Sequence, residues 1–152
     1  MPNTYSQLYI QIVFAVKGRQ NFIKEPFRVE LQKYISGIIA EKKQKLYAIY
    51  CMPDHTHILV SLKPNLAISH LVGTIKSNSS SFIKDKNFEK SFSWQEGFGA
   101  FSYSKSQSQN VVNYILNQPQ HHKKKTFKNE YLEFLKKFEI EYDEKYLFEF
   151  YD

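Results

Sequence analysis

The chain has 152 residues, a length that suits a single domain with one hydrophobic core. Hydrophobic residues make up 42% and charged residues 24%, a composition typical of globular proteins that excludes an intrinsically disordered chain. Lysine and arginine exceed aspartate and glutamate by 21 to 15, and the resulting net charge of +6 favours polyanionic partners.

Cysteine content and hydropathy exclude several other classes. The single cysteine, Cys51, cannot form an intrachain disulfide, and it lies in an apolar run where a buried, inert thiol is expected. No apolar stretch approaches the ~20 residues of a membrane span, and the first ten residues do not resemble a signal peptide. We therefore expect a cytoplasmic protein without membrane association, folded as one domain over residues 1–152.

The hydrophobic pattern predicts alternating strands and helices in the first two thirds of the chain. In chain order these are a strand over 8–16, a helix over 26–43, strands over 46–52 and 55–62, a helix over 67–84 and a strand over 100–104. The order corresponds to the ferredoxin-like split βαβ pattern. We therefore predict an α+β fold, with helices on one face of an antiparallel sheet.

Two further segments follow the fourth predicted strand. Helical spacing predicts a helix over 108–117 that stops near Pro119, because proline disfavours helical backbone in the residue before it. The remaining tail carries recurrent aromatic residues, among them Tyr131, Phe134 and Phe138. A segment this apolar is not a linker, so we expect it to pack on the body of the protein or on a partner.

The first group of residues with chemical potential is His55-Thr56-His57, at the start of the third predicted strand. Residues two apart in a strand point to the same face, so both imidazoles can converge on one metal ion. An isolated His-x-His is more often a pair of surface histidines beside a turn. Two histidines also leave a metal site incomplete, and a further ligand must complete it.

The second group is Tyr114 and Gln118 in the late helix. Residues four apart lie on one helical face, so a phenol and an amide would project side by side. An amide oxygen can bind a hard divalent ion, and a tyrosine beside that ion can act as a nucleophile. Free tyrosine has a pKa of roughly 10 and needs such help at neutral pH. By itself, in a chain with 16% aromatic residues, Tyr114 would be better explained by core packing.

Together the two groups resemble the signatures of a known enzyme family. Residues 52–60, MPDHTHILV, resemble the strand of HUH endonucleases, in which two histidines flank a usually hydrophobic residue. Residues 94–102, WQEGFGAFS, resemble the segment before the catalytic helix of the single-tyrosine transposases of small bacterial insertion sequences, and the similarity covers nearly the whole chain. Thr56 departs from the usual hydrophobic residue. Its side chain is expected to point away from the histidine face, so the substitution should be tolerated.

The resemblance implies a specific chemistry. A divalent ion, Mg²⁺ or Mn²⁺, would be held by His55, His57 and Gln118, and Tyr114 would attack a phosphodiester of single-stranded DNA. This reaction leaves a 5′-phosphotyrosine and a free 3′-hydroxyl, and its reversal joins strands without ATP. The reaction is therefore a transesterification at insertion-sequence ends.

The resemblance also implies partners. The DNA would be single-stranded with hairpin ends, and the enzyme would be a homodimer in which the tyrosine helix of one subunit can complete the histidine pair of the other in trans. Gly97 and Gly99 would then serve as hinges, although both are equally consistent with an ordinary turn.

Four basic residues near predicted loops and strand ends are candidate DNA phosphate contacts: Lys17, Arg19, Lys76 and Lys105. His121 and His122 are adjacent and do not face one way, so we expect them to be solvated or to contact phosphate. Two alternatives to a transposase remain at this stage. One is a non-catalytic single-stranded nucleic-acid-binding protein of ferredoxin-like fold, and the other is a domesticated relative that processes repeated hairpins.

Overall fold

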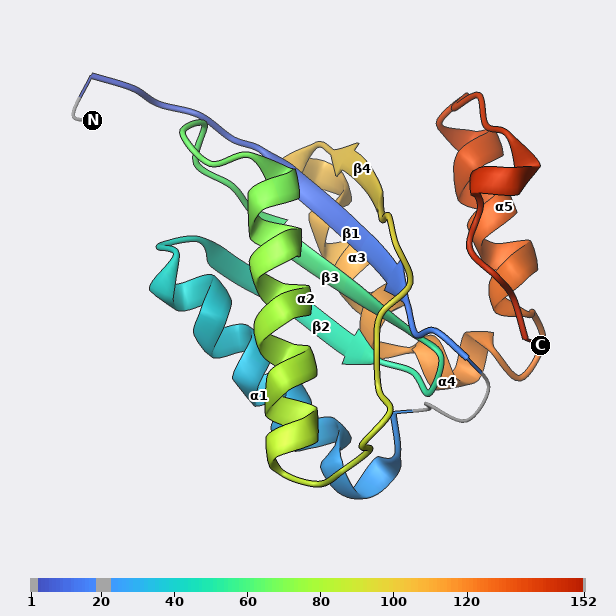
Figure 1. Ribbon diagram of the computed structural model, residues 1–152. Coiled ribbons are helices and arrows are strands. Elements are labelled where there is room, and N and C mark those ends of the chain that lie inside the picture. Colours follow the sequence, from blue (N-terminus) through green and yellow to red (C-terminus); the bar gives the residue numbers. More distant parts are fainter. Residues whose placement is uncertain (1–2, 19–22, 152) are drawn as a thin grey trace.

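A four-stranded antiparallel sheet forms the centre of the protein (Figure 1). The computed structural model describes residues 3–18 and 23–151. The strands, in the spatial order β2-β3-β1-β4, are β1 (Tyr9–Ala15), β2 (Lys45–Cys51), β3 (His55–Ser61) and β4 (Gly99–Tyr103). Every neighbouring pair is antiparallel, which confirms the predicted ferredoxin-like order.

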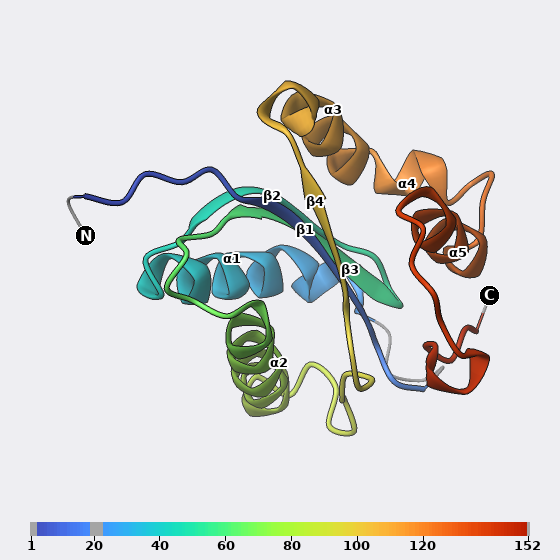
Figure 2. The same cartoon turned by 90° about the horizontal axis from the view of Figure 1, so that it is seen from above.

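Helices α1 (Glu25–Glu41) and α2 (Ile68–Asp85) cover one face of the sheet (Figure 2). Alternate residues of the central strands point into this layer and meet the apolar stripes of both helices. The resulting core includes Ile12, Phe14, Ile58, Val60, Leu31, Ile35, Leu71 and Ile75, all of which are fully buried. No helix in the described part of the chain is both long and apolar enough to span a membrane.

The opposite face is covered by the C-terminal third of the chain (Figure 2). Helix α3 (Lys105–Leu116) packs on β2 and β3, and the short helix α4 (Gln118–His121) leads to α5 (Phe127–Lys137). A second apolar cluster joins α5 and the tail to β1 and β4 through Val13, Ala15, Phe101, Phe127, Tyr131, Leu135 and Phe148. The aromatic tail therefore packs on the body of the same chain, which is one of the two arrangements expected from the sequence.

The last residues are fixed by hydrogen bonds as well as by apolar contacts. The Gln95 side chain accepts from the Glu149 N–H at 2.7 Å and donates to the Glu149 carbonyl at 2.8 Å. The Tyr151 hydroxyl accepts from the N–H of Gly18 at 3.0 Å. After a single turn of 3₁₀ helix, η1 (Glu144–Tyr146), the tail thus returns to the end of β1.

Three details differ from the sequence-based expectations. Helix α3 begins at Lys105 instead of residue 108, because the Gln107 side chain accepts from the Ser104 N–H and caps the helix. It ends at Leu116, so Gln118 opens a separate helix and does not share one with Tyr114. Helix α5 was not predicted. Its N-cap is Thr126, whose hydroxyl accepts from the Asn129 N–H at 3.2 Å.

Candidate functional site

The alternation of β3 places both of its histidines on the face that α3, α4 and α5 cover. His55 and His57 have no exposed surface, and they lie opposite Ala15 and Val13 of β1. Thr56 points to the other face, into the layer of α1 and α2, as expected from the period of a strand. The His-x-His pair is therefore buried and is not a surface pair beside a turn.

His55 is oriented by a carboxylate from the preceding turn. Its Nδ1 lies 2.7 Å from Oδ1 of Asp54, and its ring stacks on Phe127 with centroids 3.9 Å apart. Burial lowers the pKa of His55, but the interactions with Asp54 and Glu130 outweigh burial and raise this pKa to about 9. His55 is therefore protonated at neutral pH in the metal-free protein, and its Nε2 is directed into the site.

His57 is oriented by a neutral amide. Its Nδ1 lies 2.9 Å from Nε2 of Gln11 on β1, and Oε1 of Gln11 accepts from the Tyr103 hydroxyl at 2.9 Å. Burial lowers the pKa of His57, so this imidazole is neutral under conditions in which His55 is charged. Gln11 was not identified from the sequence, since it occupies an ordinary polar position in an alternating strand.

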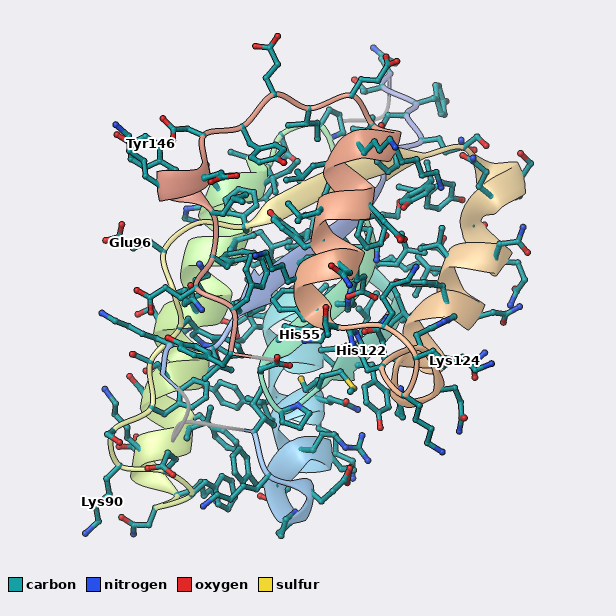
Figure 3. The ribbon with its side chains drawn as sticks, turned by 90° about the vertical axis from the view of Figure 1, so that its right-hand side faces the viewer. His55, Lys90, Glu96, His122, Lys124 and Tyr146 are labelled. Atoms are coloured by element: carbon teal, nitrogen blue, oxygen red, sulfur yellow. The ribbon has the colours of Figure 1, made fainter. Side chains whose placement is uncertain are left out.

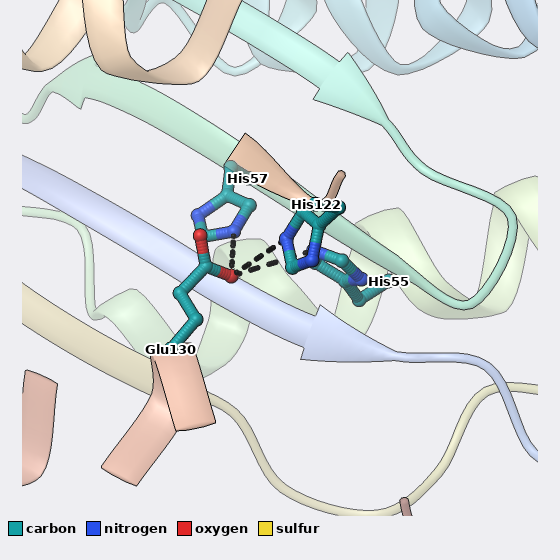
Figure 4. Close-up of side chains that lie close together, drawn as sticks. All are labelled: His55, His57, His122 and Glu130. Carbon is teal, nitrogen blue, oxygen red and sulfur yellow. Dashed lines mark hydrogen bonds and ion pairs between the residues drawn. The ribbon is translucent and has the colours of Figure 1, made fainter. Parts of the chain in front are cut away.

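Glu130 of α5 is the residue on which the site converges (Figure 4). Its carboxylate is 2% exposed, and Oε1 lies 3.0 Å from Nε2 of His57, 3.2 Å from Nε2 of His122 and 3.5 Å from Nε2 of His55. Burial raises the pKa of Glu130, but the surrounding imidazoles outweigh burial and hold it far below its usual value. The carboxylate is therefore ionised.

Tyr114 and Gln118 contact the other oxygen of the same carboxylate. The Tyr114 hydroxyl and Nε2 of Gln118 both donate to Oε2 of Glu130, the latter at 2.9 Å. Burial and the adjacent carboxylate raise the pKa of Tyr114, so the phenol is neutral at physiological pH. Within a single chain, the structure thus brings together four residues that the sequence singled out: His55, His57, Tyr114 and Gln118.

His122 also belongs to the cluster, which differs from the solvated or phosphate-contacting role expected of it. It follows α4 and lies beside His55 (Figure 3), and its Nε2 lies 3.0 Å from Oε1 of Gln118. The ligating atoms of His55, His57, His122 and Glu130 all lie within 4.8 Å of one another. Imidazole nitrogens and a carboxylate are common ligands of divalent ions. The cluster could therefore hold a metal ion.

The candidate DNA contacts lie outside this cluster. Lys105 is exposed at the start of α3, and Lys17 is exposed beyond the end of β1. Lys76 is half-buried and donates to the carbonyl oxygens of Gln95 and Gly97 at 2.8 and 2.5 Å, so part of its bonding capacity is used inside the protein. Arg19 lies outside the described residues.

An open pocket between α3 and α5 leads to the tyrosine. Its volume is about 360 Å³, and its lining includes Tyr103, Asn110, Tyr114, Phe134 and Lys137. Amide, aromatic and basic side chains therefore line this pocket beside Tyr114, together with the carboxylates of Glu130 and Glu133.

Comparison with known proteins places this arrangement in a family. The model of the family described as "Transposase IS200 like" matches residues 4–118. The chain belongs to the IS200-like transposase family. The match includes the histidine pair, Tyr114 and Gln118, and ends before His122 and Glu130.

Solved structures of two other proteins share the fold of this IS200-like transposase. A putative transposase from Deinococcus radiodurans R1 is 20% identical with a TM-score of 0.61, and the match covers 76% of this chain and 94% of that one. A REP-associated tyrosine transposase bound to a REP hairpin is 17% identical with a TM-score of 0.60, over 79% of this chain and 72% of that one. No curated protein matches the chain.

Proposed function

We propose that this IS200-like transposase cleaves and rejoins single-stranded DNA through Tyr114. The tyrosine oxygen attacks the phosphorus of a phosphodiester, the bond to the 3′ oxygen breaks, and a 5′-phosphotyrosine and a free 3′-hydroxyl result. The reverse attack by a 3′-hydroxyl restores a phosphodiester and frees the tyrosine. This proposal rests on one observation: the Tyr114 hydroxyl and the buried histidine pair contact the same carboxylate, that of Glu130.

His55, His57 and Gln118 fit the metal-binding role that the resemblance implies. The Nε2 atoms of both histidines and Oε1 of Gln118 face the same small volume, and His55 is held there by Asp54. A bound Mg²⁺ or Mn²⁺ would polarise the scissile phosphate and offset the charge on its oxygens. In this proposal the protein residues fix the ion and the nucleophile relative to each other.

Tyr114 must lose its proton during the attack. Its raised pKa keeps the phenol neutral in the resting protein, and its hydroxyl proton is already directed at a carboxylate. Deprotonation ahead of the attack is therefore unfavourable, and proton transfer should accompany bond formation to phosphorus.

The pocket between α3 and α5 offers a route for the DNA strand. The half-buried rings of Tyr103 and Phe134 line this pocket and would contact the bases, and Lys125 and Lys137 add positive charge to a lining that also holds Glu133. We further propose phosphate contacts by Lys17, Arg19, Lys76 and Lys105, in keeping with the basic composition of residues 1–120.

The proposed substrate is single-stranded DNA from insertion-sequence ends that carry hairpins. A hairpin is bound in the structure of the REP-associated tyrosine transposase, which supports this choice. We also propose a homodimer in the bacterial cytoplasm. Because Tyr114 reaches the histidine cluster of its own chain, a trans arrangement would require α3 to exchange between subunits.

Covalent trapping tests the proposed chemistry. The protein is incubated with labelled single-stranded oligonucleotides from its own element's ends, with Mg²⁺, with Mn²⁺ or with chelator, and then denatured. We expect a DNA-protein adduct that requires metal and is lost in Tyr114→Phe and His57→Ala.

Tyr146→Phe is the matched control, since this tyrosine is 80% exposed and distant from the cluster, and it should form the adduct normally. Tight, salt-dependent binding without an adduct would overturn the proposal in favour of a non-catalytic binding protein. An adduct that survives Tyr114→Phe would show that another tyrosine is the nucleophile.

A further inference from the structure

The position of Glu130 suggests a role beyond that of a hydrogen-bond acceptor. Nε2 atoms from three imidazoles lie 3.0, 3.2 and 3.5 Å from a single carboxylate oxygen, and no histidine in this group has substantial exposure. Atoms that can bind a metal ion thus surround one buried point, and they come from β3, from the end of α4 and from α5. Histidine nitrogens and carboxylate oxygens are bound to metal ions at about 2.0–2.2 Å, which puts ligands on opposite sides of an ion about 4.2 Å apart. The 4.8 Å spread of the cluster is close to that spacing.

We propose that Glu130 and His122 are ligands of the same ion as His55 and His57, and that this set selects Mn²⁺ over Mg²⁺. The inference rests on the proposed function in one respect: it assumes that the ion is the one that lies beside Tyr114 in the proposed reaction. Both added ligands lie after residue 118, beyond the part of the chain that matches the family model. They are therefore a feature of this chain's C-terminal elements, α4 and α5.

The donor types support the choice of metal. Mg²⁺ prefers six oxygen ligands and retains several waters, whereas imidazole suits first-row transition metals. Three imidazoles in one buried cluster therefore favour Mn²⁺ over Mg²⁺. The carboxylate also supplies the negative charge that a site of neutral histidines and an amide lacks, which compensates an ion held away from water.

A structural role is the competing explanation. In that case Glu130 would only hold the imidazoles and Tyr114 in place by hydrogen bonds, without binding the ion. Glutamine has the shape of glutamate and keeps one acceptor oxygen, but its amide nitrogen only donates and it has no charge. Glu130→Gln therefore separates the two roles better than truncation does.

The experiment measures binding of Mn²⁺ alone and of Mg²⁺ alone by isothermal titration calorimetry, in the full chain without DNA. We expect the wild-type protein to bind Mn²⁺ at least about tenfold more tightly than Mg²⁺. Glu130→Gln and His122→Asn should each weaken Mn²⁺ binding by about tenfold or more and reduce the preference over Mg²⁺. Circular dichroism checks that each variant is folded.

Glu133→Gln is the matched control on the same helix. Its carboxylate is exposed and pairs with Lys125 at 2.5 Å instead of facing the cluster, so its Mn²⁺ affinity should equal that of the wild type. The visible absorption spectrum of bound Co²⁺ provides a second readout. Its intensity and band positions depend on the ligand set, and they should change in Glu130→Gln but not in Glu133→Gln.

Two results would overturn the inference. Wild-type Mn²⁺ affinity in folded Glu130→Gln and His122→Asn would show that neither residue binds the ion, and equal wild-type affinities for Mn²⁺ and Mg²⁺ would remove the proposed selectivity. Neither result affects the covalent adduct with Tyr114. Conversely, Mn²⁺ binding that depends on Glu130 in a protein that forms no adduct would support this inference and reject the proposed reaction.

Discussion

The two histidines of β3 differ in the ring nitrogen that their neighbours leave available. Asp54 accepts a hydrogen bond from the Nδ1–H of His55, which leaves Nε2 as the nitrogen that can bind an ion once its own proton is lost. The amide nitrogen of Gln11 faces Nδ1 of His57, so the neutral ring carries its proton on Nε2, toward Glu130. Metal binding through that Nε2 requires Gln11 to present its oxygen instead. Rotating the Gln11 amide by half a turn places its oxygen toward His57 in nearly the same space. The amide nitrogen then donates to the Tyr103 hydroxyl, which changes from hydrogen-bond donor to acceptor.

Thr56, between the two histidines, has a buried hydroxyl that lowers the stability of the protein, and a substitution can remove this hydroxyl. Its Oγ1 is the one buried side-chain oxygen or nitrogen in the described ranges that lacks a hydrogen-bond partner, and Cys51 across the hairpin offers only a thiol. We expect Thr56→Val to raise the free energy of unfolding by about 1 kcal/mol, because it replaces the unpaired hydroxyl by a methyl group of similar size. Chemical denaturation measures the change.

Thr126→Val serves as the opposite control. The hydroxyl of Thr126 caps α5 through Asn129, so its removal should lower the free energy of unfolding by about 1 kcal/mol. A loss of stability in Thr56→Val would mean that its hydroxyl has a bonding partner. Adduct formation should be unchanged in Thr56→Val, because this side chain points away from the histidine face.

At the scale of elements, the position of α5 depends on a close approach to β4. A Cβ placed on Gly99 would lie 2.7 Å from the hydroxyl oxygen and 2.9 Å from a ring carbon of Tyr131. Tyr131 follows Glu130 directly, so the lack of a side chain on Gly99 allows the helix to sit where its carboxylate reaches the histidines. Gly97 has a different role, since its φ of +84° is the left-handed conformation that favours glycine.

Gly99→Ala should therefore displace α5. We expect a loss of about 1–3 kcal/mol in the free energy of unfolding, because the added methyl group overlaps a packed ring, and weaker Mn²⁺ binding because Glu130 moves with Tyr131. Thermal unfolding and calorimetry measure the two effects. Gly37→Ala is the control: Gly37 is exposed in α1 with no atom within 4 Å of its Cβ position, so alanine should stabilise that helix by up to about 1 kcal/mol. Equal stability changes in the two variants would contradict the role assigned to Gly99.

Local patterns in the sequence predict the elements of the sheet layer well, but they predict only part of the site. The strands and helices up to residue 103 follow alternation and helical spacing, and the His-x-His and Tyr114–Gln118 spacings indicate chemistry directly. Glu130, by contrast, lies in a helix whose aromatic stripe resembles ordinary core packing. Its contact with β3 spans 73 residues of chain, and no local spacing encodes that pairing. The Thr126 cap ahead of the aromatic stripe was the one local signal for α5.

For the whole molecule, the residues after 118 complete the fold as well as the site. They cover the face of β1 and β4 that would otherwise expose Val13, Ala15 and Phe101 to water. The tail is also fastened to the loop before β4, through Gln95 and Glu149. The ferredoxin-like layer and the C-terminal elements therefore depend on each other.

A chain that ends at residue 140 tests this dependence. It retains all residues of the histidine cluster but loses Phe148 and the Gln95–Glu149 bonds, so we expect a melting temperature lower by several degrees and stronger binding of a hydrophobic dye. Tyr146→Ala in the full chain should change neither property, because this side chain is largely exposed. A truncated chain with the wild-type melting temperature would show that the tail adds little to stability.

The distribution of the cluster over β3, α4 and α5 gives an ion bound there a mechanical function. It would act as a cross-link between β3 and the C-terminal elements, whose side chains lie 63 residues (Gln118 from His55) and 73 residues (Glu130 from His57) further along the chain. Ligand binding to the folded state alone adds about 2.7 kcal/mol at a concentration one hundred times the dissociation constant. The C-terminal elements would then be held by two kinds of interaction. A chelator leaves the aromatic contacts intact, but it removes the ion and with it the metal cross-link. Proteolysis in the presence of chelator should accordingly begin in the segment between α4 and α5, while the ferredoxin-like layer remains protected.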